Sequence, residues 1–306
     1  MAKSKKSSKK QSPSSKAEKV VKDEAVKTEK VEKAEKTEKA EKKVEKKKKG
    51  FFGKLFERKF DANENILTIF KNKKIYAALI GEILGTMVLC MVLLTLGGYQ
   101  PRYILFVLVA IMVAVYAFSG ANLNPIVTVG MMVTRRMSAI RGVLYLLAQL
   151  VGAWLGQLVI LGFLNGSGAE AEMPAMAEVA DGMFWHVTML EFVGAIIIAF
   201  FFARALQYKR SVFTFAAVAA GGVMIAFVVV YLLSYNYFEL TNNFILNPAI
   251  AFMHQILPNE AEGFGELMGK VALALLTYVI FPVIGGVIGF LISDAGSVLN
   301  EENVNQ

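Results

Sequence analysis

Long apolar segments alternate with short polar ones between about residue 75 and residue 293. Six uninterrupted apolar runs lie at 75–97, 103–118, 143–164, 183–203, 212–235 and 271–293. Most of them reach or exceed the roughly 20 residues that a helix needs to cross the hydrocarbon core of a bilayer, and the second run is shorter. The pattern predicts an all-α membrane protein with six transmembrane helices.

Two further apolar segments, 124–134 and 247–257, are too short to cross a bilayer. They read "NPIVTVGMMVT" and "NPAIAFMHQIL", 11 residues each. A helix of that length extends about 16 Å, which is close to half of a hydrocarbon core about 30 Å thick. We therefore predict two re-entrant half-helices that enter from opposite sides and together form a seventh span.

Both short segments begin with an Asn-Pro pair, Asn124-Pro125 and Asn247-Pro248. Proline suits the first turn of a helix, and asparagine is a good N-cap. Each helix start carries about half a positive charge. Two starts that meet at the midplane would favour water or neutral hydroxyl-bearing solutes and repel cations, protons included. A single Asn-Pro indicates only a turn, but this pair opens two short segments in corresponding places.

The two halves of the chain resemble each other. "GEILGT" at 81–86 matches "LEFVGA" at 190–195, and "QLVGAWLG" at 149–156 matches "PVIGGVIG" at 282–289. Since three spans carry the chain across the membrane, the second copy is inverted relative to the first, and such repeats place their working site near the midplane. The matching glycines, three or four residues apart, are typical of close helix packing.

Glu82 and Glu191 are the only acidic residues within the six runs. A carboxylate buried there without a partner is costly. One interpretation is a proton or ion relay. The other is structural, with each carboxylate accepting hydrogen bonds from the backbone that leads to a half-helix. Their matching positions in the two halves favour the structural interpretation.

The net charge of +8 comes from the beginning of the chain. Residues 1–50 contain 19 Lys and 9 Asp or Glu, whereas residues 51–306 contain 14 Lys or Arg and 16 Asp or Glu. The first 50 residues repeat Glu and Lys without an apolar face, which predicts a disordered cytoplasmic tail. Residues 51–70 place phenylalanines among lysines, which is typical of a basic amphipathic segment beside a membrane. The tail could contact anionic lipid, and we expect no nucleic-acid binding.

Loop charges predict the orientation of the chain in the membrane. The loops after the second and fourth runs contain six basic residues: Arg135, Arg136, Arg141, Arg204, Lys209 and Arg210. The loops on the opposite side contain only Arg102 and Lys270. By the positive-inside rule, the N- and C-termini are cytoplasmic. We expect a multi-pass protein of the cell (plasma) membrane, with the first half-helix entering from the cytoplasm.

These motifs resemble those of the aquaporin, or major intrinsic protein, family. "SGANLNPIVT" at 119–128 and Asn247-Pro248-Ala249 resemble its paired Asn-Pro-Ala signatures, and the glycine-containing motifs resemble its first, third and sixth spans. The resemblance covers about 70–293 and implies an aquaporin-like channel domain at 71–295, followed by a C-terminal tail at 296–306. It further implies a right-handed six-span bundle, a homotetramer with one pore per subunit, and passive transport of small neutral solutes, glycerol or water.

The resemblance has two departures that concern function. Ile126 stands where the family usually has alanine, and it would crowd the contact between Pro125 and Pro248. Ile250 stands where the family usually has the arginine of its selectivity filter. By resemblance, the other three filter positions are Ile104, Tyr235 and Phe244, and Phe244 is similar to the glycerol-facilitator, or aquaglyceroporin, branch. The implied filter is apolar and lacks one barrier to cations.

Other classes of function fit the sequence less well. We find no catalytic constellation, phosphate-binding loop or metal-ligand cluster, so we expect neither an enzyme nor a bound cofactor or metal. An ion-coupled secondary transporter remains an alternative, because broken helices and inverted repeats also serve that class and Glu82 or Glu191 could bind an ion. A non-conducting membrane adaptor that acts through its basic tail is a further alternative.

Overall fold

A computed structural model of the chain describes residues 50–57, 64–96, 101–166, 183–208, 211–238, 244–254, 256 and 263–304. The chain divides into two units, 1–54 and 55–306. Of the first unit only residues 50–54 are described, so the predicted disorder of the tail lies almost wholly outside the described residues. The short helix α2, Phe51–Leu55, lies at the boundary of the two units.

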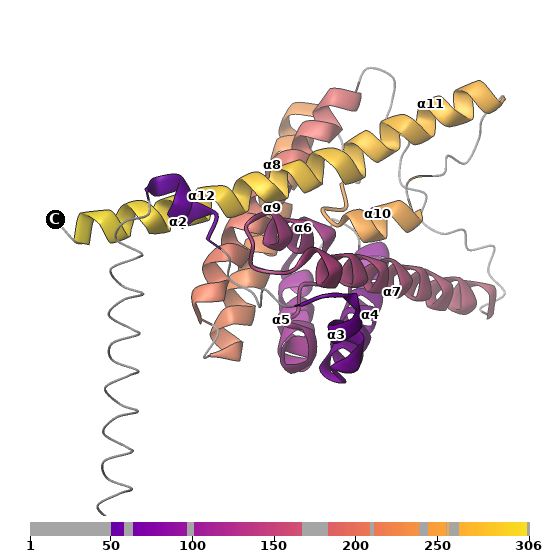
Figure 1. The fold of residues 1–306 in the computed structure, drawn as a ribbon. Coiled ribbons are helices and arrows are strands. Elements are labelled where there is room, and N and C mark those ends of the chain that lie inside the picture. Colours follow the sequence, from indigo (N-terminus) through magenta and orange to yellow (C-terminus); the bar gives the residue numbers. More distant parts are fainter. Residues whose placement is uncertain are drawn as a thin grey trace, which may run out of the picture. The chain divides into compact units, whose positions relative to one another are not determined.

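The described parts of the second unit consist of helices joined by loops, with no β-strand among them (Figure 1). Its elements are α3 Ile66–Lys71, α4 Lys74–Leu96, α5 Pro101–Ser119, α6 Pro125–Val133, α7 Ala139–Gly166, α8 Phe184–Ala205, the 3₁₀ turn η2 Leu206–Tyr208, α9 Val212–Phe238, α10 Pro248–His254, α11 Phe264–Leu275, the π-helical η3 Leu276–Ile280 and α12 Phe281–Val304. The predicted all-α fold with six long helices and two short ones is confirmed.

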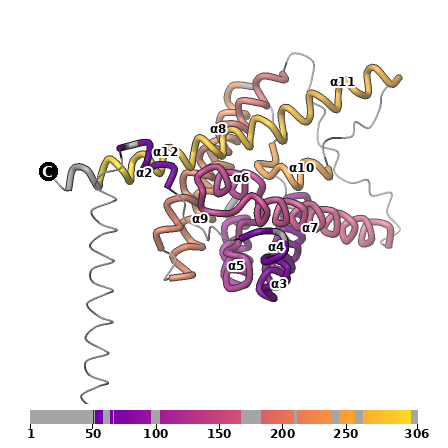
Figure 2. The backbone as a smooth tube through the Cα atoms, viewed as in Figure 1, coloured from indigo at the N-terminus to yellow at the C-terminus, as the bar shows by residue number. Residues whose placement is uncertain are grey.

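Among the described residues, five helical stretches are long and apolar enough to cross a membrane, and α5 is a shorter apolar helix. They coincide with the six predicted runs. The sixth stretch is longer than predicted, because α11, η3 and α12 follow one another without a break, as the tube in Figure 2 shows. Their 12, 5 and 24 residues make a helix about 60 Å long. Residues 296–304 of the predicted C-terminal tail are helical and continue α12.

Two glycine-lined contacts hold the second unit together, and the first joins α7 to α4. An added Cβ at Gly152 would come within 2.4 Å of the carbonyl oxygen of Ile83, and one at Gly156 within 2.6 Å of that of Met87. Contacts this close to backbone atoms exclude any larger residue. The first matched glycine motif therefore fixes how closely these two helices approach.

The second contact joins α12 to α8 and repeats the first. An added Cβ at Gly285 would lie 2.6 Å from the carbonyl oxygen of Phe192, and one at Gly289 would lie 2.4 Å from that of Ile196. The two halves of the chain thus use the same glycine spacing against the same kind of surface. The matching glycine contacts in the two halves are what the inverted repeat in the sequence predicts.

An ion pair ties the end of α6 to α12. Both terminal guanidinium nitrogens of Arg136 donate to the carboxylate of Asp294, with Nη1 at 2.7 Å from Oδ2. The Arg136 guanidinium also lies 5.4 Å from the ring centroid of Phe290. Because both charged side chains are largely buried, this pair anchors the loop after α6 more firmly than an exposed pair would.

We predict that Gly289→Ala lowers the stability of the second unit by about 1–3 kcal/mol, the usual cost of overpacking. Gly296→Ala is the matched control in the same helix, because nothing lies within 4 Å of its added Cβ. Its stability should stay unchanged or rise slightly, since alanine favours helices. Thermal unfolding in detergent can be followed through the reaction of a fluorogenic maleimide with Cys90, the single cysteine, which is fully buried. Equal unfolding midpoints for the two variants would contradict the close contact.

Candidate functional site

The two short helices α6 and α10 lie among the long helices and begin in the same way (Figure 1). Asn124 is the N-cap of α6, and its side-chain oxygen accepts a hydrogen bond from the backbone N–H of Ile126 at 2.9 Å. Asn247 caps α10 in the same manner, accepting from the N–H of Ala249 at 3.1 Å. Pro125 and Pro248 follow as the first helical residues, where no backbone N–H is needed.

The two caps bond to each other's loops across the molecule. The amide nitrogen of Asn124 donates to the carbonyl oxygen of Leu246 at 2.8 Å, and that of Asn247 donates to the carbonyl oxygen of Leu123 at 3.0 Å. These residues are more than 120 positions apart in the sequence. The two helix starts therefore face each other, and each asparagine amide satisfies a backbone carbonyl of the opposite loop.

A buried glutamate supports each of the two loops. Glu82 is fully buried and accepts hydrogen bonds from the backbone N–H groups of Asn122, at 3.0 Å, and Leu123, at 2.8 Å. Glu191 accepts from the N–H groups of Ile245, at 2.6 Å, and Leu246, at 3.1 Å. Both carboxylates thus satisfy backbone donors that would otherwise have no partner inside an apolar bundle, as the structural interpretation of these residues requires.

Three loop residues have a strained backbone, and two of them, Leu123 and Leu246, accept the asparagine amides. Ala121, Leu123 and Leu246 have φ angles of 57°, 56° and 54°. A left-handed conformation costs a residue with a side chain about 1–2 kcal/mol. The hydrogen bonds from the asparagines to Leu123 and Leu246, and from the loop N–H groups to the glutamates, offset this cost.

Two more glycines make room for the strained leucines. An added Cβ at Gly85 would come within 2.4 Å of a Leu123 methyl group, and one at Gly194 within 2.4 Å of a Leu246 methyl group. Each glycine lies three residues after the glutamate that holds the same loop. In α4 and in α8, one helical turn thus provides both the glutamate that accepts hydrogen bonds from the loop and the glycine against which the loop leucine packs.

The first half of the site has a polar cluster that the second half lacks. The amide nitrogen of Gln149 donates to Glu82 at 2.7 Å and to the hydroxyl of Thr128 at 2.9 Å. The corresponding positions of the second half hold Pro282 and Ala251, which cannot make these bonds. Our sequence analysis missed Gln149 and Thr128, although Thr128 lies one helical turn after Asn124 and could have been found from that spacing.

The capping asparagines face a cavity of about 20 Å³. That volume holds about one water molecule. Its lining consists of Leu89, Leu93, Leu108, Met112, Asn122, Leu123, Asn124, Val127, Ile198, Phe202, Val223, Phe227, Ile245, Leu246 and Asn247. Among these described residues none is ionisable, and the three asparagines are the only polar side chains.

The wall of the cavity follows the inverted repeat. Leu89 and Ile198 each lie seven residues after the buried glutamate of their half, and Leu93 and Phe202 each lie eleven residues after it. The cavity wall also includes Leu108 and Met112 of α5 and Val223 and Phe227 of α9. Both halves therefore build the same kind of apolar wall.

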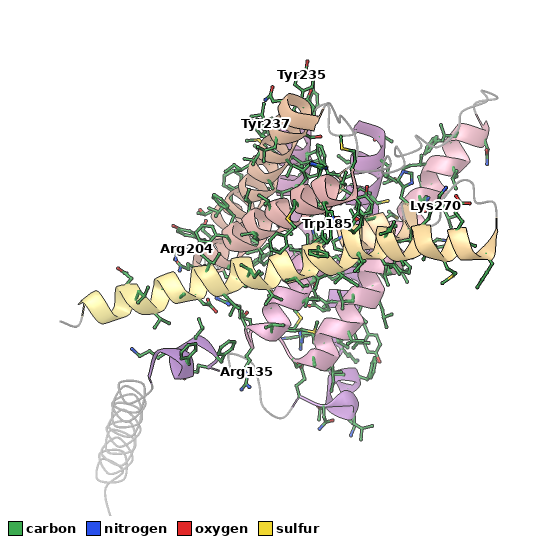
Figure 3. All side chains as sticks on the ribbon, turned by 90° about the horizontal axis from the view of Figure 1, so that it is seen from above. Arg135, Trp185, Arg204, Tyr235, Tyr237 and Lys270 are labelled. Atoms are coloured by element: carbon green, nitrogen blue, oxygen red, sulfur yellow. The ribbon has the colours of Figure 1, made fainter. Side chains whose placement is uncertain are left out.

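Three of the four predicted filter residues lie in one apolar core. Ile104, Phe244 and Ile250 are buried there, in the core that also includes residues of the cavity wall. Tyr235 is 56% exposed, stacks on Tyr231, and lies at the end of α9 beside Tyr237 (Figure 3). The structure therefore does not bring Tyr235 to the other three. Tyr231, one turn earlier, packs against their core instead.

The bulk of Ile126 is accommodated by α12. Its Cγ2 lies 2.7 Å from where a Cβ would stand at Gly286, and its carbonyl oxygen is equally close. The resemblance implies alanine at this position. The additional carbons of Ile126 fit because Gly286 of α12 has no side chain. Pro248 and Ala249 are buried at the start of α10, as Pro125 and Ile126 are in α6.

Comparisons with known proteins identify the fold and the family. The family model described as "Major intrinsic protein" matches residues 68–293. The aquaglyceroporin from Plasmodium falciparum has a similar structure, with a TM-score of 0.50 and 17% identity over 73% of this chain and 96% of that one. At this identity the similarity supports the fold alone.

Curated relatives match over shorter stretches. Glycerol uptake facilitator protein-like 6 of Lactiplantibacillus plantarum is 32% identical over 26% of this chain and 40% of its own length. Aquaporin PIP1-2 of Musa acuminata is 33% identical over 30% and 36%, and Aquaporin-B of Dictyostelium discoideum is 30% identical over 42% and 51%. The chain thus spans about half or less of these relatives. Since the family model covers most of the chain, the chain belongs to the major intrinsic protein family and is a multi-pass membrane protein.

Proposed function

We propose that the chain is a channel for the passive transport of small neutral solutes, with glycerol and water among them. The observation that carries this proposal is the pair Asn124 and Asn247, whose amides face a cavity with an otherwise apolar wall apart from Asn122. The proposed route passes this cavity, and the two Asn-Pro motifs, residues 124–126 and 247–249, form its centre.

Hydrogen-bond accounting supports a solute that carries hydroxyl or carbonyl oxygens. A carboxamide nitrogen has two N–H groups. Asn124 and Asn247 each use one of them on a backbone carbonyl, which leaves one N–H each for a solute. A passing oxygen can accept these bonds and so replace part of its lost hydration.

The surroundings disfavour ions. No ionisable side chain is among the described residues that line the cavity, so a cation would lose its hydration without gaining a counter-charge. The start of α6 presents positive partial charge to the same space. Glu82 and Glu191 are committed to the loop backbones, which leaves the proposal of an ion-coupled transporter without support.

The names of relatives agree with this proposal. They include a glycerol uptake facilitator, an aquaglyceroporin and several aquaporins. We further propose that Ile104, Phe244 and Ile250 form an apolar selectivity filter that lacks a fixed cation. Such a filter would admit a carbon backbone more readily than one that contains arginine.

We also propose the orientation and assembly implied by the loop charges and the resemblance. Arg135 and Arg204 lie toward the C-terminal half of α12, and Lys270 lies on α11 (Figure 3). We propose that the side with Arg135 and Arg204 is cytoplasmic, so that both termini are inside the cell. The proposed membrane is the plasma membrane. The proposed assembly is a homotetramer, with a channel domain at 71–295 and a basic tail that contacts anionic lipid.

We predict that wild-type protein in liposomes accelerates the equilibration of glycerol and water, and that Leu108→Trp reduces both permeabilities at least about tenfold by filling the route. Leu108 is 2% exposed and lines the cavity. Phe106→Trp is the matched control on the same helix, because Phe106 is 71% exposed and should tolerate the change. Stopped-flow light scattering measures both fluxes. Equal behaviour of the two variants would place the conduction route elsewhere.

A second prediction concerns the missing arginine. Ile250→Arg should reduce glycerol permeability by about tenfold or more and water permeability much less, because a bulky cation narrows the filter while still offering hydrogen bonds to water. Ile250→Leu is the control and should retain the wild-type ratio. Both fluxes can be measured on one liposome preparation. A glycerol-to-water ratio unaffected by the arginine would show that Ile250 lies outside the route.

A further inference from the structure

Asn122 is the polar side chain lining the cavity that has no polar counterpart in the other half of the repeat. It lies two residues before Asn124 and is only 3% exposed. Its counterpart, two residues before Asn247, is Ile245, which lines the same cavity. One half of the cavity therefore carries a carboxamide where the other half carries an aliphatic side chain.

The orientation of the Asn122 amide follows from its neighbour Thr128. The hydroxyl of Thr128 donates its proton to the carbonyl oxygen of Asn124 at 3.2 Å, and its oxygen already accepts from Gln149. The group of Asn122 that meets this oxygen at 3.4 Å must therefore be the nitrogen, as a donor. The carboxamide oxygen Oδ1 of Asn122 is directed away from Thr128 and accepts no hydrogen bond from a described residue.

The other two asparagines offer the opposite chemistry. Their side-chain oxygens accept from the backbone of Ile126 and Ala249, where they cap the half-helices. Asn124 and Asn247 each keep one N–H that can be donated to a solute, while their oxygens are occupied by the capping bonds. Asn122 lines the cavity, and its Oδ1 is the one of the three lining carboxamide oxygens that accepts no hydrogen bond from a described residue.

We propose that Asn122 is a specificity-determining residue, which completes a subsite for solutes that both donate and accept hydrogen bonds, such as polyols and urea-like amides. The inference rests on the proposed function and deepens it. A hydroxyl or amide group donates a proton to Oδ1 of Asn122 and accepts from the N–H of Asn124 or Asn247. Solutes that can only accept, or that are wholly apolar, leave this oxygen without a partner.

Water needs this acceptor less than a polyol does. A water molecule in single file can donate to the next water in the file when a wall group is absent. The carbon backbone of a polyol fills the narrow space and excludes those neighbouring waters, so its hydroxyl protons depend on the wall. Removal of the Asn122 oxygen should therefore change the ratio of solute to water permeability rather than both fluxes equally.

The test compares Asn122→Thr with Asn122→Val in proteoliposomes that contain the full chain. The two replacement side chains have the same shape, both are too short to preserve the amide contact with Thr128, and only threonine keeps an oxygen acceptor. We expect glycerol-to-water and urea-to-water permeability ratios about tenfold higher for Asn122→Thr than for Asn122→Val, the effect of one hydrogen bond of about 1.4 kcal/mol. The pair Asn122→Ser and Asn122→Ala repeats the comparison with smaller side chains, in case the branched pair does not conduct water.

The outcomes separate this inference from the proposed function. If wild-type protein conducts water and solute and the paired variants show equal ratios, the acceptor role of Asn122 is overturned while the channel proposal stands. If wild-type protein raises neither permeability above that of empty liposomes, the proposed function is overturned, and the inference with it. A higher ratio in the oxygen-bearing member of the pair supports both.

Discussion

Every backbone polar group of two interrupted helices has to find a partner inside an apolar bundle, and the rest of the structure depends on how this is done. Glu82 and Glu191 receive the N–H groups of the loops, while Asn124 and Asn247 cap the half-helices and bond to the opposite loops. Because unsatisfied groups cost several kcal/mol each in lipid, these few side chains determine the shape of the centre.

Close helix contact makes that arrangement possible. The loops reach the carboxylates because α4 and α8 carry glycine where Leu123 and Leu246 press against them, at Gly85 and Gly194. The glycine contacts of α7 with α4 and of α12 with α8 then hold these helices in place. Small residues thus set the distances over which the polar groups act, and both halves of the chain use the same solution.

The two halves differ where chemistry is concerned. The apolar wall takes residues from both halves, but Gln149, Thr128 and Asn122 have no polar counterparts in the second half. Repeated backbones with unequal side chains give a nearly symmetric passage with an asymmetric set of donors and acceptors. The bonds that keep the loops in shape are therefore separate from the side chains in which the two halves differ.

The sequence alone determined the six spans, the two half-helices and their inverted order, because these follow from the length of apolar runs and from local rules for starting a helix. Only the tertiary structure decided which bonds each asparagine makes, how Gly286 accommodates Ile126, and that Tyr235 is exposed at the end of α9. The continuation of the last helix through residues 296–304 was also beyond sequence patterns. These features depend on contacts between distant parts of the chain, whose distances no local rule specifies.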